Sequence, residues 1–443
     1  MGKTKKHCII GAGFSGLTAA RKLVELGEDF VIYDKNAGVG GLWHTGVYDS
    51  AHLVSSKTNT QFPDFPMPEH YPDFPGKPLM QKYLHDYARH FGILPKINFN
   101  KTVARVCPAS DSEETLDWLV EINGEPPQRF GTVIVANGHL SGMSKPRQVA
   151  YPGEFTGEIL YANAYRNACR FKDQRLLVVG AGNTGCDIAV DASYEAEKTH
   201  LSMKHGQYFL PKTFMGIPIS DLSSPRVRLG SGFERLAGKF ICWLSVGDLT
   251  HYGLPQPDHK LFEKHPTINT QVLYQIKHGH IQVKPEIKRY DGKMVEFVDG
   301  SRDEYDVIMF ALGYHVTFPM IHAEDKLLDW AGDVPILFWG LMAPKYRGLF
   351  FSGLGQARTG GGPLFQHGGN IIARLAAKEI ASDAGVMALL QRHRGLAFAQ
   401  KYFGMKFVDT LETRSLSGEQ VRKQIRWAYK FLDAIGCPDT PGP

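Results

Sequence analysis

A glycine spacing that occurs twice constrains the fold of this chain more than any other feature of its 443 residues. In each copy a short apolar segment, at 5–10 and at 175–179, runs directly into the spacing G-x-G-x-x-G. A helical pattern follows both, over 17–26 and from 186 towards 194. The two loops are Gly11-Ala12-Gly13-Phe14-Ser15-Gly16 and Gly180-Ala181-Gly182-Asn183-Thr184-Gly185. Strand, glycine turn and helix in this order predict a β-α-β unit that binds a dinucleotide, and the chain is expected to contain two such units.

The first loop has the setting that dinucleotide binding requires. Its glycines allow a tight turn and a close approach to a pyrophosphate, and the helix N-terminus supplies N–H groups and positive potential. A second apolar strand is expected over 30–33, and Asp34 stands at its end. A carboxylate there is expected to bind ribose hydroxyls. Because all these parts are in place, a glycine turn without a ligand is the weaker interpretation.

The second loop differs at the end of its second strand, which is expected around 200–203. An acidic residue there would indicate NAD, but the sequence has Ser202, Lys204 and His205. A cation beside a hydroxyl suits a ribose 2′-phosphate, which predicts NADPH. The alternative is that Lys204 is an ordinary solvated lysine.

The composition is typical of a globular protein and argues against several functional classes. The net charge of +5 is small, and no basic block points to nucleic acid. The six cysteines form no C-x-x-C pair, which disfavours a metal site and a dithiol reductase and predicts a reduced, cytoplasmic setting. The N-terminus has no apolar signal core, and no segment approaches the ~20 apolar residues of a membrane span. No membrane anchor is therefore expected.

Apolar periodicity in the rest of the chain completes an α/β pattern. Strands are expected over 118–122 and 131–136, and helices over 79–91 and 370–380. Strands that alternate with helices are typical of parallel sheets covered by helices. We therefore predict an α/β fold with two Rossmann-like dinucleotide-binding domains.

Several further segments together resemble the class B flavin-dependent monooxygenases, the family of the flavin-containing monooxygenases. They cover most of the chain in the order that this family has. The segments are Gly40-Gly41-Leu42-Trp43-His44; Asp64-Phe65-Pro66, similar to a D-F-P motif; Ala136-Asn137-Gly138, similar to A-T-G; Phe155-Thr156-Gly157 with Tyr161 and Tyr165, at the spacing of the fingerprint F-x-G-x-x-x-H-x-x-x-(F/Y); and Phe310-Ala311-Leu312-Gly313-Tyr314, similar to F-A-T-G-Y.

The resemblance implies FAD and NADPH as cofactors, with O₂ as co-substrate. The chain order then implies an FAD-binding domain made of residues 1–170 and 311–443, with the NADPH-binding domain inserted at 171–310. Within the inserted domain, scattered Pro, Gly and aromatic residues over about 207–270 predict an irregular insertion. Besides the two loops, the residues expected at the cofactors are Asp34, Lys35, Gly41, Leu42, Trp43, His44, Val103, Gln356, Tyr161, Tyr165, Ser202, Lys204 and His205.

Three departures from the family pattern affect the expected chemistry. Tyr161 replaces the fingerprint histidine, which leaves the coupling of NADPH oxidation to oxygenation open. The fingerprint ends in Tyr165, whereas relatives that oxidise ketones usually have tryptophan, and this favours oxygenation of heteroatoms. The family's catalytic asparagine falls at Val54, and Asn59 lies five positions further on. Either Asn59 takes that role in a shifted loop, or the chain lacks the amide, which the spacing favours.

The implied activity is oxygenation of a small-molecule sulfide or amine by a C4a-(hydro)peroxyflavin. Three alternatives stay open: a Baeyer–Villiger enzyme acting on ketones, an uncoupled NADPH oxidase or flavin reductase, and a nucleotide-sensing protein without catalysis. The sequence does not decide between a monomer and a homodimer.

Overall fold

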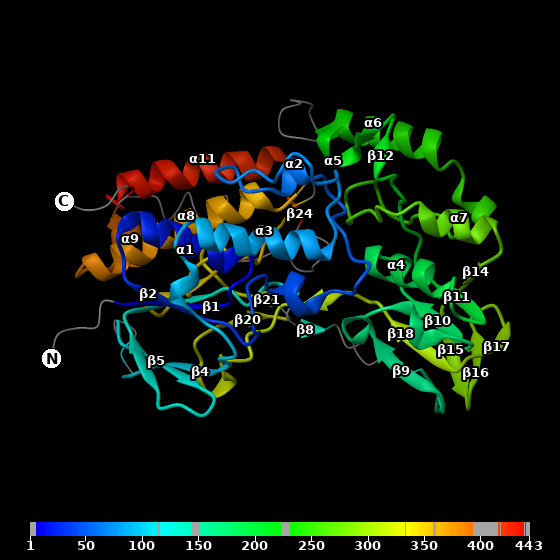
Figure 1. Cartoon of the computed structure of the whole chain (residues 1–443), viewed down its shortest axis with the longest axis horizontal. Coiled ribbons are helices and arrows are strands. Elements are labelled where there is room, and N and C mark those ends of the chain that lie inside the picture. The colour runs from blue at the N-terminus through cyan, green and yellow to red at the C-terminus, as the bar shows by residue number, and fades with distance from the viewer. Residues whose placement is uncertain are drawn as a thin grey trace. The chain divides into compact units, whose positions relative to one another are not determined.

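Strand β1 (His7–Ile10), which leads into the first glycine loop, is the central strand of a parallel sheet in the computed structural model (Figure 1). It pairs with β2 (Phe30–Tyr33) on one side and with β7 (Thr132–Val135) on the other. The outer strands are β3 (Ile97–Asn98) and β22 (Leu349–Phe351), which gives the order β22-β7-β1-β2-β3. All residues of β1, β2, β7 and β22 are buried, as expected for a parallel sheet covered on both faces.

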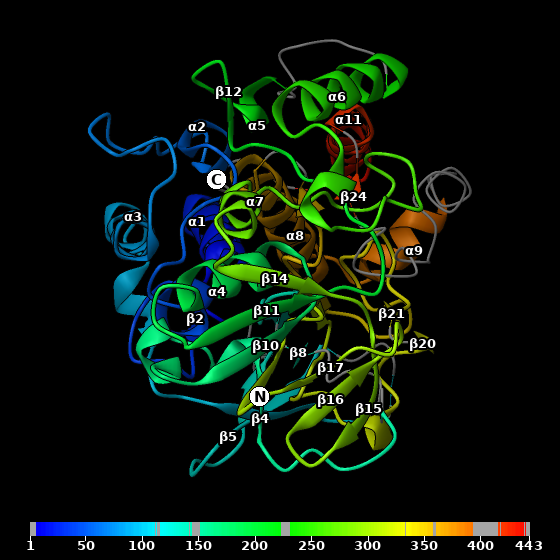
Figure 2. The ribbon, with the colours of Figure 1, turned by 90° about the vertical axis from the view of Figure 1, so that its right-hand side faces the viewer.

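A second sheet repeats this arrangement around β10 (Arg175–Val179), the strand before the second glycine loop. Its neighbours are β11 (Lys198–Ser202) and β18 (Val307–Phe310), and its outer strands are β14 (Ile281–Lys284) and β9 (Glu158–Tyr161). Figure 2 shows β14, β11 and β10 side by side. Both glycine loops therefore follow the central strand of a five-stranded parallel sheet. The predicted α/β class with two Rossmann-like sheets is confirmed.

The two sheets belong to separate compact units. The first unit comprises Met1–Gly46, Lys57–Gly142 and His315–Pro443, and the second comprises Val47–Ser56 and Met143–Tyr314. The residues that the structure describes are 6–110, 112, 116–140, 142–143, 151–222, 231–332, 334–357, 360–392, 415–416, 418–437 and 439.

The bounds of the second unit differ from the inserted domain expected at 171–310. It begins at Met143 because β9 pairs in parallel with β18 and so belongs to the second sheet. It also includes Val47–Ser56, a segment that the chain order alone assigns to the other domain.

Each unit carries a small antiparallel sheet that comes, in sequence, directly before a strand that pairs with its central strand, β7 in the first unit and β18 in the second. In the first unit it consists of β4 (Val103–Pro108), β5 (Trp118–Ile122) and β6 (Gln128–Phe130). In the second it consists of β15 (Ile287–Asp291), β16 (Met294–Phe297) and β17 (Arg302–Glu304). The duplication thus extends beyond the β-α-β units that the sequence indicates.

The helices that matter most for the sites begin at the glycine turns. In the first unit α1 (Phe14–Leu26) packs against α8 (Gly362–Ala381), where a Cβ on Gly369 would lie 2.5 Å from Thr18 Oγ1 (Figure 1). In the second unit α4 (Asn183–Ala192) follows the second loop. The remaining helices are α2 (Lys57–Thr60), α3 (Lys77–His90), α5 (Ile219–Leu222), α6 (Ser231–Ser245), α7 (Gln271–Lys277), α9 (Gly385–Arg392) and α11 (Gly418–Ala434).

The short elements complete the fold. They are η1 (Leu42–Gly46), η2 (Leu94–Lys96), η3 (Ala162–Ala164), η4 (Ala168–Phe171), η5 (Leu249–Tyr252), η6 (Ala323–Asp325), β8 (Gly142–Met143), β12 (Thr213–Phe214), β13 (Ile217–Pro218), β19 (Tyr314–His315), β20 (Trp330–Ala331), β21 (Val334–Pro335), β23 (Gln356–Ala357) and β24 (Ser415–Leu416).

The stretch expected to be irregular at about 207–270 contains a 15-residue helix, α6, so that prediction is wrong in part. One side of α6 packs inward through Gly238 and Ile241, while Phe240 and Trp243 are exposed on the other. Apolar residues on both sides, and Gly238, which lowers the helix propensity, obscure the helical pattern of this segment in the sequence.

The C-terminal segment is joined to the helix of the first loop through buried cations. Lys22 on α1 is 4% exposed, and its Nζ donates to Asp439 Oδ1 at 2.9 Å. Arg374 on α8 is 1% exposed and donates to Asp433 Oδ1 at 2.8 Å. A buried cation needs a partner, so these two pairs fix the end of the chain against α1 and α8.

His200, the third residue of β11, is buried, and its surroundings predict that the second unit is sensitive to acid. Its Nδ1 lies 2.7 Å from Tyr305 Oη and 3.5 Å from Asp303 Oδ2. Burial lowers the pKa of His200 from 6.5 to about 4, and Lys284 and Lys198 also lower it while Asp303 opposes the shift. The unfolded chain therefore binds a proton more readily than the folded one, and stability is lost as the pH falls from 6.5 towards 4.

We predict that His200→Gln reduces this acid sensitivity, because the amide keeps a hydrogen-bonding side chain but does not titrate. Melting temperatures near pH 7.5 and near pH 5 provide the measurement. The wild type should lose more degrees between the two conditions than the variant. Equal losses in both proteins would show that His200 is not the group responsible.

Candidate functional site

The first and third glycines of each loop are required by the packing of the protein itself. Gly11 has a φ of +112°, and a Cβ there would lie 2.5 Å from Ala136 O. A Cβ on Gly16 would lie 1.9 Å from Gly11 O. In the second loop the matching distances are 2.6 Å, from Gly180 to Ala311 O, and 1.9 Å, from Gly185 to Gly180 O. Any side chain at these four positions would push backbone apart.

The middle glycine of each loop has no comparable reason within the protein. Gly13 has a φ of −92°, and the nearest atom to a Cβ there would be Gly41 Cα at an ordinary 3.5 Å. Gly182 has a φ of −71°, it is exposed, and a Cβ there would meet nothing within 4 Å. Neither conformation nor packing demands glycine at these positions. What remains is the close approach of a ligand to the first turn of the helix, as a pyrophosphate requires.

Asp34 holds the first loop in shape. Its Oδ2 accepts a hydrogen bond from Ala12 N at 2.6 Å, its Oδ1 accepts one from Asn36 N at 2.8 Å, and the residue is 5% exposed. Each carboxylate oxygen keeps a second lone pair. The predicted bond to a ribose is therefore compatible with this role in the loop, and it stays a prediction.

The Gly40–His44 segment packs on the first loop backbone to backbone. Gly40 N donates to Ala12 O at 3.1 Å, and a Cβ on Gly41 would lie 3.0 Å from Gly13 Cα. The chain then forms the single π-turn η1, which begins at Leu42 and continues through Trp43 to Gly46. His44 Nδ1 lies 2.6 Å from Gln81 Nε2 of α3. This segment therefore forms one wall beside Gly13.

The other residues expected near the first loop differ in what their side chains do. Phe14 packs its ring on Phe62 and Phe365 at centroid distances of 5.1 and 5.6 Å. Ser15 is buried, and its Oγ would lie 2.0 Å from a Cβ on Gly353. Phe14 and Ser15 can therefore offer a ligand their backbone N–H groups. Lys35 is exposed, Val103 is 7% exposed in β4, and the side chain of Gln356 lies outside the described residues.

The residues that follow β2 and β11 occupy matching positions in the two units, but one is a carboxylate, Asp34, and the other is the apolar Met203. Asp34 N donates to Asn98 O, and Met203 N donates likewise to Lys284 O, each at 3.0 Å. Met203 thus occupies the position of Asp34, so the second loop has no carboxylate at the site where NAD-binding units carry one.

The polar residues next to Met203 form hydrogen bonds or ion pairs with other residues of the second unit. Ser202 is 2% exposed, and its hydroxyl donates to Pro285 O at 2.6 Å, so it faces the protein interior. Lys204 Nζ lies 2.9 Å from Glu286 Oε1, and its side chain is 60% exposed. His205 Nδ1 lies 3.2 Å from Asp258 Oδ2. Of the two predicted 2′-phosphate ligands, only the exposed Lys204 could turn towards a nucleotide without disturbing the core.

The remaining residues of the second site divide between surface and core. Asn183 Oδ1 accepts from Ile268 N at 2.7 Å, which fixes the start of α4, and Thr184 follows it half-exposed. Tyr161 is half-buried on β9 with its ring 5.9 Å from that of Phe310. Tyr165 is fully buried, and its hydroxyl donates to Asp191 Oδ2 at 3.0 Å. Burial and Asp191 raise the pKa of Tyr165, and this side chain has no surface to offer a nucleotide.

The two candidate positions for the family asparagine lie in different units. Val54 belongs to the second unit and packs against an apolar cluster that includes Ile219 and Ile268. Asn59 lies on α2 in the first unit, against the glycine turn that precedes α8. A Cβ on Gly360 would lie 2.3 Å from Asn59 O. The backbone of Asn59 therefore lies beside a glycine turn of the first unit, and its role as the family's amide stays a prediction.

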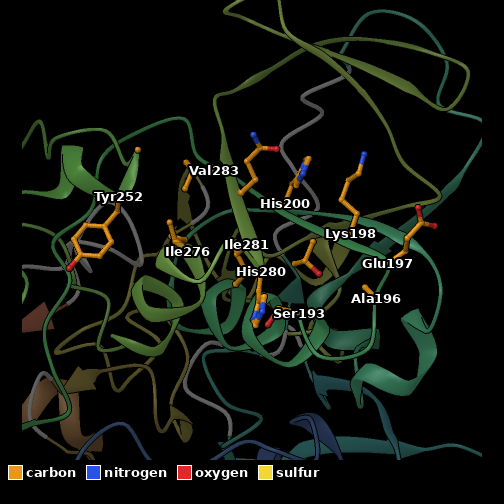
Figure 3. Close-up of a pocket in the computed structure, with 14 residues that line it drawn as sticks. Ser193, Ala196, Glu197, Lys198, His200, Tyr252, Ile276, His280, Ile281 and Val283 are labelled. Carbon is orange, nitrogen blue, oxygen red and sulfur yellow. The ribbon is translucent and has the colours of Figure 1, made fainter.

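A cavity of about 710 Å³ lies elsewhere in the second unit (Figure 3). Its wall includes Lys198 and Thr199 at the start of β11, Ile281 at the start of β14 and His280 just before it. The Gly180–Gly185 loop follows the carboxyl end of the central strand, so this cavity lies at the opposite end of the sheet. It is not the nucleotide site.

In the part of the chain that the structure describes, no helix is both long enough and apolar enough to cross a bilayer. The same residues contain no group of three or more His, Cys, Asp or Glu side chains arranged to hold a metal ion.

Two parallel sheets, each with a glycine loop after its central strand, define a protein with two dinucleotide-binding folds. Residues 4–375 match the model of the flavin-binding monooxygenase-like family, and the chain belongs to this family.

Curated relatives agree with this assignment. Flavin-containing monooxygenase 5 of Rattus norvegicus is 32% identical over 353 residues, which are 73% of this chain and 64% of the rat protein. The chain thus spans somewhat less than two thirds of that relative. The probable indole-3-pyruvate monooxygenase YUCCA9 of Arabidopsis thaliana is 32% identical over 340 residues, covering 72% of this chain and 77% of that protein.

Solved structures share the fold at lower identity. A flavin-containing monooxygenase from Stenotrophomonas maltophilia is 21% identical with a TM-score of 0.64, covering 86% of this chain and 99% of that one. A cyclohexanone monooxygenase bound to ε-caprolactone is 18% identical with a TM-score of 0.74, covering 98% and 99%.

The glycine geometry gives a prediction that needs no ligand. Gly185→Ala should lower the free energy of unfolding by about 2–4 kcal/mol or prevent folding, because its Cβ meets a backbone carbonyl. Gly182→Ala should cost no more than about 1 kcal/mol, because its Cβ meets open space. Thermal or denaturant unfolding of the two variants provides the comparison. Similar losses in both would contradict the distinction between packing glycines and ligand glycines.

Proposed function

We propose that this chain is an FAD- and NADPH-dependent monooxygenase that transfers one oxygen atom of O₂ to a sulfide or amine of a small molecule. The observation that carries the proposal is the pair of middle glycines, Gly13 and Gly182, which the protein needs for neither packing nor backbone conformation. Two such glycines support two bound dinucleotides, and membership of the family supports flavin as one of them.

The first loop is assigned to FAD and the second to NADPH. The wall formed by Gly40–His44 stands beside Gly13, and Asp34 next to the loop supports a ribose there. The second loop has Met203 where a carboxylate would repel a 2′-phosphate, and Lys204 follows it. In this proposal the first unit is the FAD-binding domain and the second the NADPH-binding domain.

The fit of these residues to the two cofactors determines what the chain does in the reaction. When bound, FAD supplies the redox chemistry that NADPH and O₂ require. The backbone N–H groups at the starts of α1 and α4 would bind the pyrophosphates. Asn59, at the turn before α8, is proposed as the amide that orients the reacting groups. The site must also exclude water, since stray protons favour loss of H₂O₂ over oxygenation.

Oxygenation of sulfides or amines is preferred over oxidation of ketones because the fingerprint ends in Tyr165. Tyr165 itself is buried against α4, so its side chain would influence a substrate only through the residues around it. Among the proteins of similar fold, one is an S-allyl-L-cysteine S-oxygenase from Allium sativum and another a cyclohexanone monooxygenase.

Product analysis separates these activities. Purified, FAD-loaded protein is incubated with NADPH and either an alkyl aryl sulfide, a tertiary amine or cyclohexanone, and both the products and H₂O₂ are quantified. We expect sulfoxide or N-oxide in excess over lactone. Lactone as the main product would replace the proposal with a Baeyer–Villiger enzyme, and H₂O₂ as the sole product would replace it with an NADPH oxidase.

A crossed pair of valine variants tests which cofactor each loop holds. Gly13→Val should give folded but colourless protein, because the side chain occupies the place of the FAD pyrophosphate. Gly182→Val should give yellow protein whose KM for NADPH rises by at least about tenfold, which corresponds to ~1.4 kcal/mol. Flavin absorbance and NADPH kinetics are measured on both. A yellow Gly13→Val protein, or a colourless Gly182→Val protein, would reverse or refute the assignment.

The preference for NADPH is expected to depend on Lys204. Lys204→Ala should lower the NADPH-to-NADH ratio of kcat/KM by about tenfold or more. The reason is the loss of one charge-assisted contact with the 2′-phosphate, worth ~1.5–3 kcal/mol. Glu286→Gln is the matched control, because it removes the competing carboxylate and should not lower the ratio. An unchanged ratio in Lys204→Ala would rule this residue out as the 2′-phosphate ligand.

A further inference from the structure

Ten residues of the chain, Val47–Ser56, leave the first unit in space although they lie between two of its segments in sequence. We call these residues the strap. They follow directly on η1, which carries Trp43 and His44, and they lead directly into α2, which carries Asn59. Both ends of the strap are thus continuous with residues proposed for the FAD site, while the strap itself packs with the proposed NADPH-binding unit.

The N-terminal part of the strap is held by α4, the helix that begins at the second glycine loop. Tyr48 is half-buried, and its hydroxyl donates to Asp187 Oδ2 at 2.5 Å. Burial, and then the negative charge of Asp187, raise the pKa of Tyr48, so it stays a hydrogen-bond donor. The other oxygen of Asp187 accepts from Asn269 Nδ2 at 2.6 Å. The carboxylate therefore joins the strap, α4 and the segment before α7.

A second carboxylate of α4 repeats this contact one turn further along. Ser50 Oγ donates to Asp191 Oδ2, which also accepts from Tyr165 Oη. The rings of Tyr48 and Tyr165 lie 5.6 Å apart. Asp187 and Asp191 are four residues apart and therefore lie on one face of the helix. This face of the proposed nucleotide helix is occupied by the strap.

Further bonds fix the middle and the end of the strap within the same unit. Asp49 N donates to Arg166 O at 2.8 Å. At the far end, Ser56 is 1% exposed, its N donates to Ser220 Oγ at 2.9 Å and its hydroxyl donates to Asp221. The strap is therefore bonded to α4 near its η1 end and to α5 immediately before α2, so both of its ends are tied to the second unit.

We propose that the strap makes the position of η1 and α2 depend on the occupancy of the second glycine loop, with Tyr48 and Ser50 as the positioning residues. This inference rests on the proposed function, because it takes NADP(H) as the ligand of that loop. A pyrophosphate bound at the start of α4 stabilises one placement of the helix. Asp187 and Asp191 pass that placement to the strap, and the strap passes it to Trp43, His44 and Asn59. The flavin site is thereby ordered when the hydride donor is bound.

Hydrogen exchange of the FAD-loaded protein with and without NADP⁺ tests this directly, because it does not require turnover. In the wild type, NADP⁺ should slow amide exchange in residues 42–46 and 57–60 as well as in the loop itself. Tyr48→Phe and Ser50→Ala should still bind NADP⁺, but the slowing at 42–46 and 57–60 should fall by at least about threefold, since one hydrogen bond is worth ~0.5–1.5 kcal/mol. Ser50→Thr, which keeps the hydroxyl, should restore it.

Tyr194→Phe is the matched control. It also removes one tyrosine hydroxyl of the second unit, which accepts from Gln275 Nε2 at 2.6 Å, but Tyr194 is 68% exposed and lies outside the strap contacts. The control should behave as the wild type does.

The outcomes separate this inference from the proposed function. Slowing at the strap ends that persists in Tyr48→Phe and Ser50→Ala, or that is absent in a wild type shown by calorimetry to bind NADP⁺, overturns the inference and leaves the function intact. A wild type that binds neither FAD nor NADP⁺ overturns both.

Discussion

The contact between the third glycine of each loop and the carbonyl of the first is the constraint on which the rest of the structure depends. A Cβ on Gly16 or on Gly185 would lie only 1.9 Å from that carbonyl oxygen, so helix and strand can meet only where no side chain stands between them. As a result, α1 and α4 each begin directly after the middle glycine of the loop, Gly13 or Gly182. The same close contact in two five-stranded parallel sheets explains why one chain can form two glycine loops of the same geometry.

Around this shared frame, the two units differ in how their polar groups are used. Asp34 is committed to the loop amides, whereas its counterpart Met203 contributes no charge and leaves Lys204 as the exposed cation. Two carboxylates of the second unit, Asp187 and Asp191, lie instead on one face of α4, where they hold the strap. The first unit thus uses a carboxylate, Asp34, to hold its glycine loop. The second unit uses two carboxylates of α4 to hold the strap, which leads to Asn59.

The sequence was sufficient for the features that depend on local chemistry and not for those that depend on packing between distant segments. Glycine spacing and buried strands predicted β1, α1, β10 and α4, because each pattern lies within a few turns of chain. The burial of Tyr165 and the inward hydroxyl of Ser202 could not be predicted, since partners such as Asp191 and Pro285 are remote in sequence. The strap was missed because nothing in residues 47–56 themselves indicates which unit they join.

Whether one chain holds FAD and takes electrons for it from NADPH is decided by anaerobic titration of the purified protein with NADPH. We expect yellow protein with one FAD per chain, whose flavin absorbance is bleached by a single equivalent of NADPH and much less readily by NADH. Protein that stays colourless after incubation with FAD, or whose bound flavin NADPH fails to reduce, would contradict this expectation.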